Sequence, residues 1–334
     1  MDMFTYSRPS QVSDAIAAAS VATTAQQGAD IRFLAGGTTL IDLMKLNVER
    51  PTKIIDINRL PLDKIKKLPD GRLSIGALVR NADLAHHPVV TSSYSVLSQA
   101  LLAGASAQLR NKATTAGNLL QRTRCMYFRN EALPCNKRTP GSGCSAIDGD
   151  NRTLAILGTS KHCIATNPSD MNVALTALNA TIHIQNKNGE RELPIDDFFL
   201  LPKNTPQHEN VLEPGDLITA VSLPAAQQKS SHVYLKLRDR ASYEFALSSA
   251  AIIAEVSNKK FSFIRMALGG LGTKPWRSFE AEKFLHEKNC EPQIFRQAAE
   301  IVLREAQPQS QNGFKIELAK RCIIQALTLA TKQA

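Results

Sequence analysis

Four cysteines in one segment are the residues of this chain best suited to chemistry. Cys125, Cys135, Cys144 and Cys163 lie in a stretch rich in proline and glycine that has neither helical nor strand periodicity. Thiolates gathered on such a stretch are typical of metal ligation, because a metal ion or iron–sulfur cluster can hold together a segment that buries little apolar surface. The intervals between the cysteines match neither zinc ribbons nor two-cluster ferredoxins. Spacing alone therefore favours a metal site and unrelated thiols about equally.

Two glycine turns are candidates for binding phosphate. The first, Gly-Gly-Thr-Thr at residues 36–39, lies between a predicted strand over 31–35 and a predicted helix over 40–46. The second, Thr-Thr-Ala-Gly-Asn at residues 114–118, comes shortly before the first cysteine. Small residues leave backbone N–H groups exposed, and such groups bind phosphate oxygens. Neither turn has the Rossmann or P-loop pattern, so each alone is weak evidence.

A single carboxylate, Asp170, follows the cysteines. It comes after an Asn-Pro-Ser turn and before an apolar helix predicted over 171–180, where it would act as the N-cap. Capping is the ordinary interpretation of such a residue and is compatible with a ligand contact. Lys236 lies in a basic stretch and would ordinarily face solvent. No Ser-His-Asp or paired-carboxylate arrangement suggests hydrolysis.

The elements that must position these residues alternate between helix and strand. An alanine-rich helix is predicted over 11–27, with Ser10 or Ser13 as its cap. Further helices are predicted over 81–86, 94–105, 279–286, 292–305 and 314–331, and strands over 53–57, 72–79, 181–185, 191–193, 217–223 and 263–268. Residues 246–256 are an apolar run, and 273–277 read as a loop. Cys290 and Cys322 lie on predicted helices and are interpreted as buried structural thiols.

Composition excludes several classes of protein. The 334 residues are 43% apolar and 21% charged, as in an ordinary soluble protein, and the longest apolar run is too short to span a bilayer. The formal net charge is +10, with an excess of basic residues between 110 and 138. Aromatic residues make up only 5%, which disfavours nucleic-acid binding. A pyrophosphate, an anionic cluster or an acidic partner subunit accounts better for the charge.

The N-terminus predicts where the chain folds. Residues 1–9 have no export signal of the secretory or twin-arginine type, so a reduced cytoplasmic folding site is expected. Under those conditions clustered cysteines are more plausibly metal ligands than disulfides.

With both glycine turns in this order, the sequence resembles the FAD-binding subunit of the molybdenum hydroxylases, the xanthine dehydrogenase and carbon monoxide dehydrogenase family, over nearly its whole length. The residues that resemble the first FAD segment of the family are Arg32, Phe33, Leu34, Ala35, Gly36, Gly37, Thr38, Thr39 and Leu40, and those that resemble the second are Thr114, Thr115, Ala116, Gly117 and Asn118. The resemblance implies that backbone amides of both turns hold the FAD pyrophosphate.

The resemblance assigns roles to further residues. It implies that Gly104 and Ala105, at a helix end, approach the cofactor, and that Ser169 and Asp170 match a motif whose aspartate contacts the FAD sugar region. It also implies that Leu217 and Ile218 lie beside the flavin ring and that Lys236 lies near the isoalloxazine.

The fold implied by the resemblance is α+β. Residues 1–225 would form a two-subdomain FAD-binding domain of the vanillyl-alcohol-oxidase-like type, divided at about residue 60, with a cysteine-rich insertion at about 122–165. Residues 230–334 would form a smaller α+β domain of the carbon monoxide dehydrogenase flavoprotein C-terminal type.

The cysteine segment narrows the resemblance to flavin subunits of periplasmic aldehyde oxidoreductases, in which Cys125, Cys135, Cys144 and Cys163 would bind a [4Fe-4S] cluster. The implied function is electron transfer in a molybdenum-dependent aldehyde oxidoreductase, a heterotrimer with a molybdenum-cofactor large subunit and a [2Fe-2S] small subunit. Alternatives are a hydroxybenzoyl-CoA reductase subunit and a zinc-stabilised binding module without redox activity. Such a complex can also reach the periplasm through a twin-arginine signal on a partner. Neither nucleic acid nor membrane is an expected partner.

Overall fold

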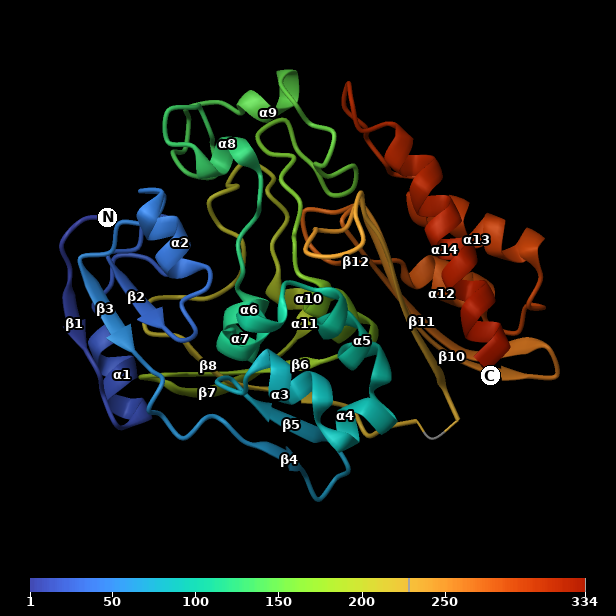
Figure 1. The fold of residues 1–334 in the computed structure, drawn as a ribbon, viewed down its shortest axis with the longest axis horizontal. Coiled ribbons are helices and arrows are strands. Elements are labelled where there is room, and N and C mark those ends of the chain that lie inside the picture. The colour runs from blue at the N-terminus through green and yellow to red at the C-terminus, as the bar shows by residue number, and fades with distance from the viewer. Residues whose placement is uncertain (228, 334) are drawn as a thin grey trace.

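The computed structural model describes residues 1–227 and 229–333. Three sheets follow one another along the chain, and Figure 1 shows the first at the left, the second below the centre and the third at the right. Among the described residues, no helix combines the length and apolar character needed to cross a membrane. The predicted α+β fold class is confirmed.

The first sheet is parallel and has the strand order β1-β3-β2. The predicted helix over 11–27 is wrong in length, because the helix ends at Ala19. The side chain of Asp30 then accepts hydrogen bonds from the backbone N–H and the hydroxyl of Thr23, which closes a loop instead. The N-cap of this first helix is Gln11, so the predicted caps Ser10 and Ser13 are also wrong. The elements of this part are β1 (Thr5–Ser7), α1 (Val12–Ala19), β2 (Ile31–Leu34), α2 (Leu40–Lys45) and β3 (Lys53–Asp56).

The second sheet is antiparallel, with the strand order β4-β5-β8-β6-β7. Its inner face carries the largest apolar core of the molecule, shared with the helices that cover it. The strands are β4 (Ile65–Lys67), β5 (Leu73–Gly76), β6 (Thr181–Asn186), β7 (Gly189–Pro194) and β8 (Leu217–Leu223), and the helices are α3 (Asn81–His86), α4 (Pro88–Ser93), α5 (Ser95–Ala103), α6 (Ala107–Lys112), α7 (Thr115–Leu119), α10 (Asp170–Ala177) and α11 (Ile195–Phe198).

The third sheet is antiparallel, with the order β12-β11-β10-β9, and three helices cover one face of it (Figure 1). Two predictions here are wrong in detail. The loop predicted over 273–277 contains a short strand, and Cys290 lies between helices because its N–H donates to Lys259 O. Cys322 is buried on a helix, as predicted. The elements are β9 (Ser231–Leu237), β10 (Ser248–Ser257), β11 (Lys260–Gly269), β12 (Trp276–Arg277), α12 (Phe279–Leu285), α13 (Pro292–Leu303) and α14 (Phe314–Gln333).

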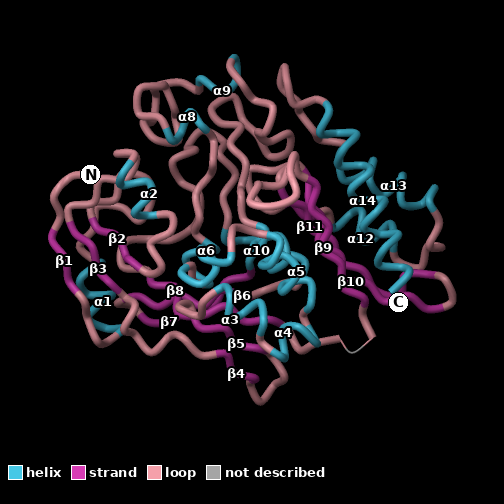
Figure 2. The backbone as a smooth tube through the Cα atoms, in the orientation of Figure 1, coloured by secondary structure: helices cyan, strands magenta, loops and turns pink. Residues whose placement is uncertain are grey.

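The cysteine-rich segment, residues 123–165, crosses the top of the view between the first and third sheets (Figure 1). Figure 2 shows it almost wholly as loop, with two single-turn helices, α8 (Met126–Arg129) and α9 (Ser145–Asp148). A small apolar core of its own, centred on the fully buried Phe128, attaches it to Leu43 of α2 and to Val48.

Candidate functional site

A pocket between the first and second sheets brings the two glycine turns together. Its walls come from β2 and the start of α2 on one side and from the beginning of β8 on the other, and the cysteine-rich segment closes one end. The predicted residues that line it are Arg32, Phe33, Ala35, Gly36, Gly37, Thr38, Thr39, Leu40, Thr114, Ala116, Gly117, Cys163, Leu217 and Ile218. Leu34, Gly104, Ala105, Thr115, Asn118, Ser169, Asp170 and Lys236 are not among the residues that line it.

At Gly36 the first turn contacts the segment that leads into the second turn. A Cβ atom on this residue would lie 2.2 Å from the carbonyl oxygen of Lys112, two residues before Thr114. Backbone cannot yield as a flexible side-chain end can, so only glycine permits this approach. Gly37 adopts a positive φ of 76°, which also favours glycine.

The turns differ in what their N–H groups can bind. In the described part of the chain, the N–H groups of residues 36–39 donate to no protein acceptor. In the second turn the N–H groups of Thr115, Gly117 and Asn118 donate to Val79 O, Thr114 Oγ1 and Thr114 O. The first turn therefore has backbone donors free for a phosphate, while the second shapes the pocket wall.

Asp170 belongs to a buried polar cluster and does not line the pocket. Its carboxylate accepts hydrogen bonds from Lys236 Nζ at 2.8 Å and from Tyr234 OH at 2.6 Å. Gly104 belongs to the same cluster, since a Cβ there would lie 3.0 Å from Asp170 Oδ2. Burial raises the pKa of Tyr234 well above its usual range, and the negative charge of Asp170 adds to this, so the phenol remains a donor.

Two expectations from the sequence are wrong: that Asp170 caps its helix and that Lys236 faces solvent. The N-cap of α10 is Ser169, whose hydroxyl accepts from Asn172 N, and Asp170 is the first helical residue. The side chain of Lys236 is 4% exposed rather than solvated, because it pairs with Asp170. Tyr234 has no sequence signal of a functional residue, since an aromatic residue in a strand is normally interpreted as core.

The four cysteines gather in the small core of the cysteine-rich segment. Cys125, Cys135 and Cys163 are buried, Cys144 is half-buried, and the backbones of Cys135 and Cys144 form a β-bridge. Burial and, to a smaller extent, the neighbouring Cys135 and Cys163 raise the pKa of the Cys125 thiol to about 12. Among the described residues, no three His, Cys, Asp or Glu side chains are arranged to hold a single metal ion.

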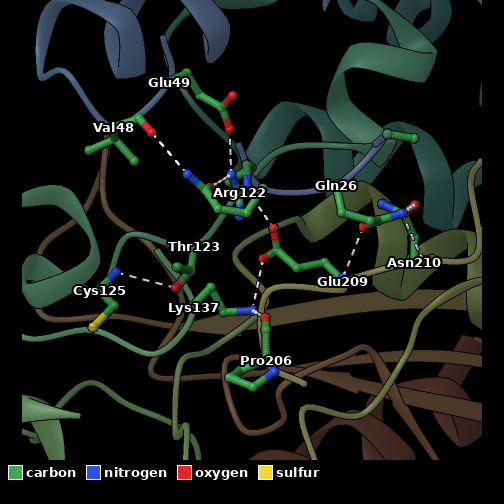
Figure 3. A network of polar contacts seen from close by, with 12 residues as sticks. Gln26, Val48, Glu49, Arg122, Thr123, Cys125, Lys137, Pro206, Glu209 and Asn210 are labelled. Carbon is green, nitrogen blue, oxygen red and sulfur yellow. Dashed lines mark hydrogen bonds and ion pairs between the residues drawn. The ribbon is translucent and has the colours of Figure 1, made fainter. Parts of the chain in front are cut away.

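A buried network of charged side chains lies where the cysteine-rich segment meets the pocket, and Figure 3 shows its polar contacts. Arg122 donates to Glu49 and to Glu209, Lys137 Nζ donates to Glu209 at 3.1 Å, and Arg32 Nη2 lies 2.9 Å from Glu49. Burial alone would raise the pKa of Glu209, but Arg122 and Lys137 outweigh it and hold that pKa at about 2.

Only the basic members of this network have a signal in the sequence. The basic excess between residues 110 and 138 includes Arg122 and Lys137, but nothing in the sequence marked Glu49 or Glu209 as their partners. All five charged residues of the network line the pocket.

Free backbone donors, a buried cationic wall and the apolar Leu217 and Ile218 suit a ligand that has both phosphate groups and a flat apolar part. Fold and site thus define a dinucleotide-binding protein. The cradle at Gly36 and an unpaired buried N–H group on Arg122 fit FAD in particular, because they provide a close backbone approach and a cationic donor.

Comparison with known proteins identifies the family to which the chain belongs. Residues 2–226 match the family model for the FAD binding domain in molybdopterin dehydrogenase, and residues 233–330 match the carbon monoxide dehydrogenase flavoprotein C-terminal domain. The chain therefore belongs to the family of FAD-binding medium subunits of the molybdenum hydroxylases, which are subunits of oxidoreductases. The family and the enzyme class expected from the sequence are confirmed.

Individual relatives agree with this. The chain is 48% identical to the aldehyde oxidoreductase FAD-binding subunit PaoB of Escherichia coli K12, with all of both chains covered. It is 30% identical to the glyceraldehyde dehydrogenase medium chain of Sulfolobus acidocaldarius, over 84% of this chain and 82% of that one. A carbon monoxide dehydrogenase structure from Hydrogenophaga pseudoflava has the same fold, with a TM-score of 0.77, 24% identity, and 100% and 99% of the two chains covered.

Proposed function

We propose that this chain is the FAD- and [4Fe-4S]-containing electron-transfer subunit of a molybdenum-dependent aldehyde oxidoreductase, which converts aldehydes to carboxylic acids. The observation that carries the proposal is the full-length similarity, at 48% identity, to an aldehyde oxidoreductase FAD-binding subunit. In this role the chain takes electrons from the [2Fe-2S] clusters of a small subunit and passes them to an external acceptor. The aldehyde reacts at the molybdenum cofactor of a large subunit.

FAD suits this task because it exchanges single electrons with clusters and electron pairs with acceptors. The N–H groups of residues 36–39 would hold the pyrophosphate, and Leu217 and Ile218 would lie against the flavin ring. Ser169, Asp170 and Lys236 remain predicted FAD contacts. The existing bonds of the Asp170 carboxylate to Lys236 and Tyr234 would keep its charge compensated before the cofactor arrives.

The [4Fe-4S] cluster would be bound by Cys125, Cys135, Cys144 and Cys163. Support comes from their common position in one small core and from the four-thiol donor set, which suits iron–sulfur chemistry. A four-iron cluster bonds its thiolates at four separate corners, so its ligands stand farther apart than those of a single ion. An arrangement that does not suit one metal ion is therefore compatible with a cluster.

The absorption spectrum of the chain, purified without oxygen and recorded before and after dithionite, tests the proposal. We expect flavin bands over a broad iron–sulfur absorbance that bleaches on reduction, with about four irons and four acid-labile sulfides per FAD. FAD without iron would contradict the proposed cluster and would leave the assignment as an FAD subunit intact. Zinc without FAD would overturn the proposal and leave a binding module without redox activity.

A second measurement concerns the partners. When the chain is expressed with a molybdenum-cofactor large subunit and a [2Fe-2S] small subunit of an aldehyde oxidoreductase, we expect the three to co-purify and to reduce an acceptor dye with an aromatic or aliphatic aldehyde. Reduction of a hydroxybenzoyl-CoA substrate in place of aldehyde oxidation would contradict the proposed reaction.

A further inference from the structure

Arg122 stands at the boundary between the pocket and the cysteine-rich segment, and it contacts both. Its side chain is 12% exposed and lines the pocket. Nη1 donates to Glu49 at 2.5 Å and to Gln27, and Nε donates to Glu209 (Figure 3). The guanidinium also stacks on Phe128, 4.6 Å from the ring centroid. Phe128 is fully buried in the same small core as the four cysteines.

The charges of the network do not balance. Arg32, Arg122 and Lys137 are positive, whereas only Glu49 and Glu209 are negative. Arg122 shares both carboxylates with Arg32 and Lys137, so the network as a whole carries one excess positive charge, and all of its members line the pocket.

The guanidinium also has an unused donor. Nη2 of Arg122 is buried and has no hydrogen-bond partner in the described part of the chain. A buried, unsatisfied donor in a network with a net positive charge is costly, so this position favours an anionic or strongly accepting ligand. The pyrophosphate of FAD supplies negative charge, and FAD offers many acceptor atoms along its length.

We propose that the Arg122 guanidinium binds FAD and, through Phe128, fixes the cysteine-rich segment, so that FAD binding and the order of residues 123–165 stabilise each other. This rests on the proposed function, which places FAD in the pocket. Coupling of this kind is reciprocal: a segment ordered by FAD must, when disordered, weaken the binding of FAD.

The test uses the full chain, purified without oxygen and stripped of FAD, in three variants. R122M keeps a long side chain over Phe128 and leaves the two remaining ion pairs balanced. R122K keeps the charge and loses the planar fork. R129M is the matched control, because Arg129 joins the same segment to Asp42 of α2 at 2.7 Å and does not line the pocket.

Two quantities are measured for each variant: the dissociation constant for FAD, from the quenching of flavin fluorescence, and the hydrogen exchange of residues 123–165 with and without FAD. In the unaltered chain we expect FAD to slow exchange in this segment. R122M should raise the dissociation constant at least tenfold and abolish the slowing, and R122K should lie between. R129M should speed exchange in the absence of FAD, keep the FAD-dependent slowing, and change the dissociation constant by less than about twofold.

Either of two results would contradict the proposed coupling. In the first, R122M binds FAD as tightly as the unaltered chain does. In the second, FAD binding leaves the hydrogen exchange of residues 123–165 unchanged. If R122M loses its far-UV circular dichroism, R122K decides by the same criteria. An unaltered chain with no affinity for FAD would instead reject the proposed function, and the coupling with it.

Discussion

Gly36 shows how one residue can determine whether the pocket forms. Its α-carbon faces the carbonyl oxygen of Lys112, so the first glycine turn rests directly on the chain that leads into the second. The order of the two turns in the sequence thus corresponds to a contact in space. Any side chain at this position must push the two turns apart.

Replacement of Gly36 by alanine is the corresponding prediction. We expect G36A to lower the free energy of unfolding by about 1–3 kcal/mol, the usual cost of overpacking, and to lower the FAD content of the purified chain. Denaturant unfolding and the ratio of flavin to protein absorbance measure the two effects. G313A is the control, because a Cβ at Gly313 meets no atom within 4 Å. A G36A chain with full FAD content would show that the contact does not matter for binding.

At the scale of elements, β9 holds the third sheet against α5. Val96 N of α5 donates to His232 Nδ1 at 3.4 Å, and His232 O accepts from Gln99 Nε2 at 3.1 Å. His232 Nε2 lies 3.0 Å from Ser230 Oγ. Burial lowers the pKa of His232 from 6.5 to about 4, so the imidazole is neutral in the folded chain.

This contact predicts a pH dependence of stability. Between pH 6.5 and about 4 the unfolded chain binds a proton at His232 that the folded chain does not bind. The stabilisation is therefore fully present above pH 6.5 and is lost as the pH falls toward 4. The variant H232Q cannot titrate at this position. As the pH falls from 6.5 to about 4, we expect the unaltered chain to lose unfolding free energy relative to H232Q, by no more than about 3 kcal/mol. Denaturant unfolding at several pH values measures this, and a constant difference would contradict it.

At the scale of the whole molecule, α10 joins the second and third sheets. All eight of its residues are buried. Its core also contains Ala251 and Ile253 of β10 and Ala267 of β11, and a Cβ on Gly269 of β11 would lie 2.5 Å from Val173 of α10. The bonds from Tyr234 and Lys236 to Asp170 cross the same boundary.

A shared core of this kind predicts cooperative unfolding. We expect calorimetry of the full chain to show a single transition, because separation of the third sheet would expose the apolar face of α10 and leave Asp170 buried without its partners. A chain ending at residue 227 should lack a cooperative transition and bind FAD poorly. Two well-separated transitions, together with a short chain that binds FAD normally, would show that the two parts fold independently.

Much of the fold could be predicted from the sequence. Strands β2, β3, β5, β6, β7, β8 and β11 and helices α2, α3, α5, α13 and α14 lie close to their predicted ranges. Alternation and helical periodicity indicate locally which face of an element is buried. The long helix predicted at residues 11–27 failed where a side chain, Asp30, competed for the backbone of Thr23. The domain boundaries and the individual roles of the FAD and cysteine residues stay predictions.

The sequence by itself determined the family, the two glycine turns and the gathering of four cysteines in one aperiodic segment. All of these are properties of residue type and order along short stretches. Only the tertiary structure decided that Arg122 meets Glu49 and Glu209, which lie 73 and 87 positions away, and that Lys236 is buried against Asp170. Such pairs form where distant parts of the chain cross. Local sequence periodicity does not predict such pairs, since the energy of a buried charge depends on which partner the fold brings to it.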